Sequence, residues 1–253
     1  MNSLNKGLLL VLTALMATGC ATTPPELTDY SAFRAEDPHS VLIVPPINNA
    51  VDVDAPAFYL STISRPVGER GYYVFPVHMV KTLLEEDGLS DANLVHDADP
   101  TLLADLFGAD SVLYVTIQRW DAQYIVLSTQ VTVQFDYVLR SGETGDVLWE
   151  ESMMRTYSSD TGNSGGGLAG LIVQAVAAAV EKASPNYVPL AQQANAQATA
   201  QAGQGVPAGK YHPMYGQDGA LFGQAPDPVA DAKSPAVETS APSEPAAPPV
   251  TDE

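Results

Sequence analysis

Short apolar runs alternate with helical periodicity in the first half of the chain. Val41–Val44 is an apolar run that Pro45 and Pro46 stop, which predicts a buried strand. Strands that alternate with helices favour an α/β fold with parallel strand pairing. Pro66 is expected to disrupt the first helix. The elements expected here are strands at 41–44, 72–75 and 111–118, and helices at 55–70, 76–87 and 100–107.

Two of these helices have a clear apolar stripe. Gly88 and Gly108 are their expected C-terminal stops, and Asp99 followed by Pro100 is a typical helix start. Each helix should bury its stripe against the sheet. The residues assigned to the two stripes are Val77, Val80, Leu83 and Leu84 in the first helix, and Leu102, Leu103, Leu106 and Phe107 in the second.

The second half changes to period-two alternation. Residues 130–139 place Val131, Val133, Phe135 and Tyr137 on one face and polar side chains on the other. The turn-forming run 141–146 precedes a returning strand from Val147 to about Tyr157. The predicted fold class is α/β: a mixed sheet in two or three layers, parallel in its first half with an antiparallel meander in its second, and helices packed on it.

The remaining chain is less regular. Leu168–Ala183 predicts a helix of very small side chains. Its stretch Leu168–Val180 either lies across the sheet, which is favoured, or contacts a partner helix or the membrane. Residues 191–205 are rich in Ala and Gln and are either helical or frayed. From about Ala225 the composition of Pro, Ala, Ser and acid predicts disorder, because little apolar surface is available to bury.

The N-terminus has the layout of a secretory signal peptide. Lys6 precedes the apolar stretch Leu8–Met16, small residues follow, and Cys20 comes next. This resembles the bacterial lipoprotein signal, in which the cysteine receives diacylglycerol, the signal is cleaved and the new amine is acylated, for example with palmitate. The alternative is an ordinary signal peptide that contains a cysteine. Ala21, where an Asp would favour inner-membrane retention, implies the outer membrane, with the chain facing the periplasm; surface display stays open.

Composition and charge narrow the possible partners. The 253 residues are 45% hydrophobic and 16% charged, with a net charge of −19. Such an acidic surface repels phosphate backbones and anionic headgroups, which excludes nucleic acid as a partner. A single cysteine excludes a disulfide framework. No uncharged apolar run reaches the roughly 18 residues of a transmembrane helix, so acyl chains are the expected attachment to the membrane.

No motif indicates catalysis, and we expect neither an enzyme nor a bound cofactor or metal. The histidines lack metal-ligand spacing, and Glu85–Asp87 is better interpreted as a solvated helix end. Ser164–Gly167 precedes a helix but lacks the lysine of a phosphate-binding loop, so a hinge or close backbone approach is the preferred interpretation.

An aromatic, turn-prone island is the remaining candidate docking motif. It contains Tyr211, His212, Pro213 and Tyr215 within a polar stretch. Docking of the two tyrosines on the parent domain is favoured over docking on a partner.

Several blocks that occur in order carry a resemblance to a known family. They are VLIVPPINNAVDVDAP (41–56), ERGYYVFPV (69–77), FGADSVLYVTI (107–117), SGETGDVLWE (141–150), SGGGLAGLIVQAV (164–176) and KYHPMYGQD (210–218). Over about residues 20–220 the chain resembles the family of the meningococcal genome-derived lipoprotein antigen, bacterial lipoproteins of unknown function.

The resemblance implies a fold like the N-terminal domain of TolB and a non-enzymatic accessory role in an outer-membrane assembly or export complex. It implies envelope lipoproteins as partners, including one similar to the curli secretion channel. The alternative is a surface-exposed structural antigen or adhesin. The expected organisation is a signal peptide at 1–19, a tether at 20–40, one α/β domain at 41–218 and a disordered tail at 219–253.

Overall fold

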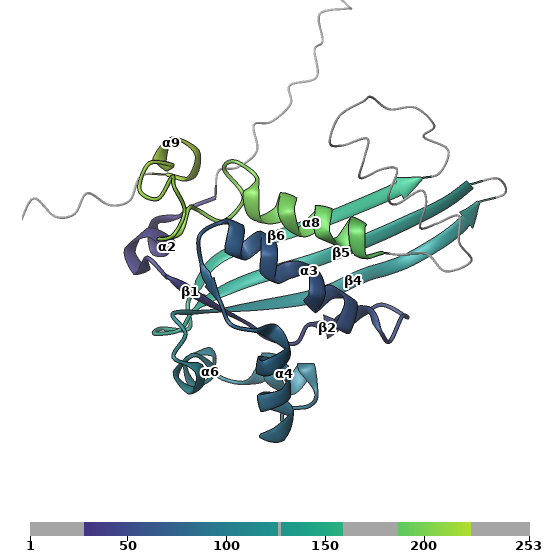
Figure 1. The fold of residues 1–253 in the computed structure, drawn as a ribbon, viewed down its shortest axis with the longest axis horizontal. Helices are drawn as coiled ribbons and strands as arrows, with labels where there is room; N and C mark the ends of the chain where they lie inside the picture. Colours follow the sequence, from purple (N-terminus) through teal and green to yellow (C-terminus); the bar gives the residue numbers. More distant parts are fainter. Residues whose placement is uncertain (1–27, 126–127, 159–186, 224–253) are drawn as a thin grey trace, which may run out of the picture.

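The computed structural model describes residues 28–125, 128–158 and 187–223. A mixed sheet in the order β3-β1-β4-β5-β6 forms its centre (Figure 1). Its first half is parallel, as expected, because β1 (Ser40–Ile43) lies between β3 (Tyr73–Val74) and the start of β4 (Ser111–Ile125). After Pro45 and Pro46 interrupt the chain, β2 (Ile47–Asn48) pairs with β4 further along, so two short strands share one long neighbour.

The second half is the predicted antiparallel meander. β4 pairs along its length with β5 (Ser128–Ser141), and β5 pairs with β6 (Val147–Ser158). A register shift interrupts each pairing, between Ile117 and Arg119 in β4 and between Leu139 and Arg140 in β5. β4 is longer than expected because the lead-in segment 119–125 continues the same strand.

Helices cover both faces of the sheet, which gives three layers. Figure 1 shows α3 and α8 side by side over one face, with α4 and α6 on the other side. The helices are α2 (Ser31–Glu36), α3 (Ala55–Glu69), α4 (Val77–Glu86), α5 (Ala92–Asp97), α6 (Pro100–Phe107), α8 (Val188–Ala200) and α9 (Gly219–Phe222). Pro66 lies inside α3, which continues to Glu69, so the expected disruption there does not end the helix.

The larger core lies between the sheet and the α3–α8 layer. Tyr59 and Ile63 of α3 pack with Phe135 and Tyr137 of β5. Of the stretch 191–205, residues 191–200 are helical within α8 and 201–205 follow its end, and three alanines of α8 are fully buried. Small side chains let its backbone approach α3 and the sheet closely. Those residues are Ala191, Ala194 and Ala198.

The smaller core lies beneath α4, α5 and α6. Val80 and Leu84 of α4 and Leu103 of α6 pack on Leu42 and Val112 of the sheet. Asp99 caps α6 as predicted, since its carboxylate accepts a hydrogen bond from the Thr101 N–H at 2.9 Å. The short α5 was not expected, because Val95 is its one buried residue.

The folded region begins earlier and ends later than the sequence suggests. Tyr30 and Phe33 belong to the larger core, so the expected tether of residues 20–40 is too long at its C-terminal end. Phe222 also joins this core, where its ring lies 5.7 Å from that of Tyr30. The expected domain end at residue 218 is therefore too early, because Phe222, which lies beyond it, belongs to the core.

Truncation should distinguish residues 219–223, which contain Phe222, from the residues beyond Gly223. A stop after Gly223 should leave the thermal midpoint unchanged, because the composition beyond it gives little to bury. A stop after Asp218 removes the buried Phe222 and should cost about 3–5 kcal/mol, as for other buried Phe truncations. Calorimetry of both chains checks this, and equal midpoints would contradict the assigned boundary.

Candidate functional site

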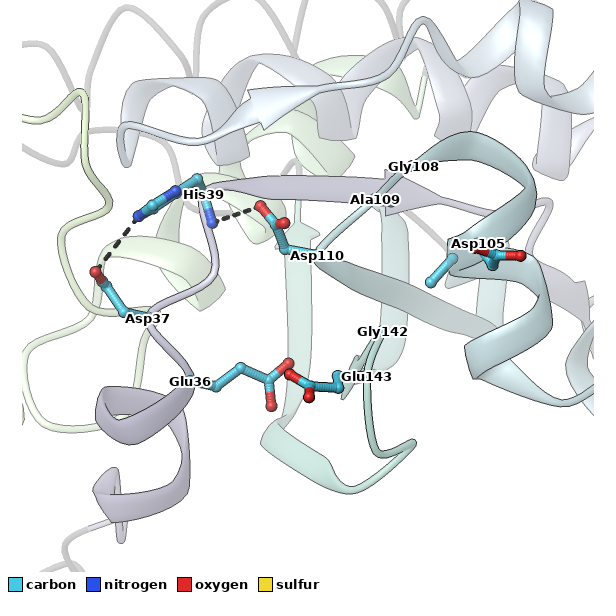
Figure 2. A pocket seen from close by; sticks show the side chains of 10 residues that line it. Glu36, Asp37, His39, Asp105, Gly108, Ala109, Asp110, Gly142 and Glu143 are labelled. Carbon is cyan, nitrogen blue, oxygen red and sulfur yellow. Dashed lines mark hydrogen bonds and ion pairs between the residues drawn. The ribbon is translucent and has the colours of Figure 1, made fainter.

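A cleft lies where α2, β1, α6 and the β5–β6 turn meet. It has a volume of about 360 Å³. Figure 2 shows carboxylate side chains reaching it from several of these elements. The cleft therefore collects negative charge from segments that are far apart in the sequence. Its lining residues are Glu36, Asp37, His39, Ala104, Asp105, Gly108, Ala109, Asp110, Gly142 and Glu143.

Asp110 has a structural task in this cleft. Its Oδ2 accepts hydrogen bonds from the backbone N–H groups of His39 and Ser40, at 3.0 and 2.9 Å, and from Ser40 Oγ at 2.9 Å. The Asp110 N–H donates to the same Ser40 Oγ at 2.9 Å. These bonds join the start of β1 to the start of β4, and so they fix the floor of the cleft.

Asp37 links the cleft to the C-terminal part of the domain. It adopts a left-handed conformation with φ of 46°, which an Asp tolerates better than most residues, and it ends α2. Its carboxylate lies 3.4 Å from His39 Nε2 and accepts a hydrogen bond from the Tyr215 hydroxyl. That hydrogen bond raises the pKa of Tyr215, because it stabilises the protonated phenol.

Glu36 and Glu143 face each other across the cleft in Figure 2. Burial raises the pKa of Glu36, and the negative charges of Glu143, Asp146 and Asp110 raise it further. Negative charges gathered in this way favour the approach of a cationic group. Within the described ranges, no three or more His, Cys, Asp or Glu side chains are arranged to hold a metal ion. The carboxylates that line the cleft suit a Lys or Arg side chain.

The segment after α8 wraps around the same end of the domain. Three buried rings donate hydrogen bonds to carbonyl groups of residues 204–207 in this segment. Trp149 Nε1 donates to Gln204 O at 2.6 Å, and the hydroxyls of Tyr30 and Tyr72 donate to Gly205 O and Pro207 O at 2.6 and 2.8 Å. Burial raises the pKa of Tyr30 to about 12, so this hydroxyl stays a donor.

The aromatic island docks on the domain through backbone contacts and the Tyr215 hydroxyl, and not through ring burial. The Tyr211 N–H donates to Gly71 O at 3.1 Å, and a Cβ at Gly71 would lie 2.3 Å from His212 N. The Tyr211 side chain stays 68% exposed and that of Tyr215 38%, so the expectation that aromatic burial holds this segment is wrong. Close backbone approach at Gly71, whose φ is 86°, and the hydrogen bond from Tyr215 to Asp37 hold it instead. Pro213 lies in the turn between His212 and Met214.

The other residues singled out in the sequence separate into two groups. Cys20, the proposed lipidation site, and the small-residue helix Leu168–Val180 lie outside the described residues. His78 is exposed on α4, and Glu85 pairs with Lys81 one turn away, which is typical of a solvated helix face. Among the residues that the structure describes, no helix combines the length and hydrophobicity needed to cross a membrane.

The apolar stripes of α4 and α6 are only partly buried. Leu83 is 45% exposed, Leu102 69% and Leu106 57%, so assigning them to the buried stripes was wrong. A short helix that packs on a sheet buries only one of its sides, and in α6 that side holds Leu103 and Ala104. The signal for a second, outward apolar flank was present in the doubled leucines Leu83–Leu84 and Leu102–Leu103.

The partial burial of His96 should make the stability of the domain depend on pH. Its Nε2 lies 3.0 Å from Pro45 O and its ring packs edge-on against Tyr114. Burial lowers the pKa of His96, against a smaller opposing effect of the Pro45 bond and Asp97. Stability present above the unfolded pKa of about 6.5 is therefore lost as pH falls toward the folded pKa. Urea unfolding at several pH values should show that the free energy of unfolding falls less at low pH in His96→Gln than in the wild type. Parallel plots of stability against pH for the two proteins would contradict this.

Comparison with known proteins places the chain in a family. Residues 28–211 match the family described as "Putative lipoprotein GNA1162-like". The curated "Putative lipoprotein NMB1124/NMB1162" of Neisseria meningitidis serogroup B is 35% identical over 172 residues, which cover 68% of this chain and 79% of that protein.

Solved structures are also similar to this chain. The crystal structure of lipoprotein GNA1162 from Neisseria meningitidis is 34% identical, with a TM-score of 0.48, and covers 58% of this chain and all of its own. The PelC dodecamer from Paraburkholderia phytofirmans is 19% identical, with a TM-score of 0.35, over 60% of this chain and 86% of its own. From the sequence match across most of its length, the chain belongs to the GNA1162-like lipoprotein family.

Proposed function

We propose that this protein is a lipid-anchored periplasmic accessory protein, attached through Cys20, that binds other envelope proteins in an outer-membrane assembly or export complex. Membership in a lipoprotein family is the observation that carries the proposal. The signal-like segment before Cys20 supports the anchor, and Ala21 supports the outer membrane. An acyl chain contributes about 0.8 kcal/mol per buried CH₂, so two or three chains hold even an acidic domain on a bilayer.

The end position of β6 in the sheet supports protein binding. Among the described strands, β6 pairs with β5 on one side only, over a length of 12 residues. A strand at a sheet edge presents backbone N–H and C=O groups that a partner strand pairs with by edge addition. Other envelope lipoproteins, including one similar to the curli secretion channel, are the proposed partners.

The anchor is tested by replacing the thiol. Cys20→Ser should move the protein from the membrane to the soluble periplasmic fraction, or leave it unprocessed, because serine cannot form the thioether. The intact mass of the wild type should show loss of residues 1–19 and a gain of acyl mass. An unmodified mature chain would exclude the lipoprotein anchor.

Partner binding is tested with a photo-crosslinking amino acid in intact cells. Placed at Met154, an exposed β6 residue, it should yield an adduct with an envelope protein. The control position is Val51, which is 98% exposed on the loop before α3. Val51 should give no adduct, and the absence of an adduct at Met154 would contradict binding at the β6 edge. Protease added to intact cells separates the periplasmic accessory from the alternative, a surface antigen, because only the surface form is cut.

A further inference from the structure

The helices α4, α5 and α6 each carry large apolar side chains that are exposed. Five large side chains between 45% and 69% exposed project from these three short helices, and all three helices pack on the same smaller core. On α4 and on α6 they form i, i+4 pairs, which lie on one side of a helix. We call this surface the α4–α6 face; its apolar residues are Met79, Leu83, Leu94, Leu102 and Leu106.

The charge around these side chains has one sign. Residues 76–110 contain a single cation, Lys81, and its ammonium already pairs with Glu85. The carboxylates of the same segment are all on exposed residues. They are Glu85, Glu86, Asp87, Asp91, Asp97, Asp99, Asp105 and Asp110. The α4–α6 face is therefore apolar with an acidic border.

The acidic cleft continues this surface past α6. Asp105 lies between the outward residues Leu102 and Leu106 in sequence, and it also lines the cleft. Glu36 and Glu143 face the same hollow from α2 and from the β5–β6 turn (Figure 2). The helix α6 thus carries exposed apolar side chains on one flank, and the carboxylates of the cleft lie at its C-terminal end.

Charge decides which occupant suits this surface. A second copy of the chain carries a net charge of −19, and an anionic bilayer is negative, so both are repelled. Outside the described residues, the chain's own cationic side chains are Lys6, Lys182 and Lys233, too dispersed to match the border. Complementary charge across an interface speeds association and selects the partner.

We propose that the α4–α6 face and the cleft together bind a cationic, apolar segment of another envelope protein. Its apolar side chains lie on Leu102 and Leu106, and one of its Lys or Arg side chains enters the cleft beside Glu36 and Glu143. This inference rests on the proposed function, for which it names the chemistry of a partner and a second surface besides β6.

Binding is measured with a defined probe and the full lipidated chain in phosphatidylcholine nanodiscs. The probe is a fluorescent 16-residue helical peptide of Leu and Lys with its leucines on one side, and empty nanodiscs give the background. Leu102→Gln/Leu106→Gln should weaken binding at least about tenfold, and Asp105→Asn/Glu143→Gln by a similar factor. Raising the salt from about 0.05 to about 0.5 M should weaken the wild type more than the second variant.

A matched control separates a site from general attraction to an acidic protein. Val53→Gln/Asp54→Asn removes one carboxylate and one exposed apolar side chain from the loop before α3, outside both proposed binding surfaces. It should leave peptide affinity within about twofold, a change of roughly 0.4 kcal/mol. Equal weakening by the control and the α6 variants, or no weakening by the α6 variants, would overturn the proposal. A Glu-for-Lys peptide should not bind.

Photo-crosslinking in cells distinguishes failure of this inference from failure of the proposed function. A crosslinker at Leu106 should join the chain to a protein at a peptide that contains Lys or Arg beside apolar residues, identified by mass spectrometry. Adducts at Met154 but not at Leu106 would overturn this inference and leave the proposed function standing. Adducts at neither position would overturn both.

Discussion

Asp218→Ala is expected to lower the free energy of unfolding by about 3–5 kcal/mol, measured by urea denaturation. Asp218 Oδ1 lies 2.6 Å from Arg34 Nη2, and Oδ2 accepts from the Ala208 N–H at 2.6 Å. The two side chains are 4% and 8% exposed. Removing the carboxylate leaves the guanidinium of Arg34 buried without its counter-charge, which is far more costly than losing an exposed ion pair.

The exposed pair Arg65–Glu69 on α3 is the matched control. Its charged atoms are similarly close, at 2.7 Å, but the side chains are 85% and 58% exposed. Glu69→Ala should change stability by at most about 1 kcal/mol, because water screens the charges. Similar losses in the two variants would show that burial does not decide the importance of the Asp218 pair.

The second large effect is expected at Asn195. Its side chain is completely buried on α8, where Oδ1 accepts from the Tyr137 hydroxyl at 2.6 Å and Nδ2 donates to Thr62 Oγ1 at 2.8 Å. Asn195→Ala leaves the buried Tyr137 hydroxyl without this acceptor and opens a small cavity. We expect a loss of about 2–4 kcal/mol in the free energy of unfolding.

A double-mutant cycle tests the reason for that loss. Tyr137→Phe removes the hydroxyl that Asn195 satisfies, so the double variant should lose less than the sum of the two single variants. Strict additivity would mean that the hydrogen bond does not couple β5 to α8. The pKa of Tyr137 is raised by burial, so the phenol stays protonated and the cycle can be run at neutral pH.

Local patterns in the sequence were sufficient for most elements. The stop at Pro45, the Asp99 cap and the period-two strand around Phe135 depend on neighbouring residues alone, and the structure has each of them. The doubled leucines indicated an outward flank at Leu102 without deciding which leucine is exposed, and the backbone docking at Gly71 did not follow from such patterns. Both depend on which surfaces the sheet leaves available once it has formed.

Alternation and capping are set within a few residues, so the α/β order, the parallel first half and the meander could be assigned from the chain alone. The roles of single side chains depended on contacts between distant segments. Asn195 is a core residue because α8 lies on α3 and β5, and Asp218 is buried because Arg34 lies beside it. The acidic cleft exists only because Glu36 and Glu143, far apart in sequence, meet at one end of the sheet. Apolar periodicity predicts which face of a strand is buried, but the contacts of single polar and charged side chains are decided only when distant segments pack together.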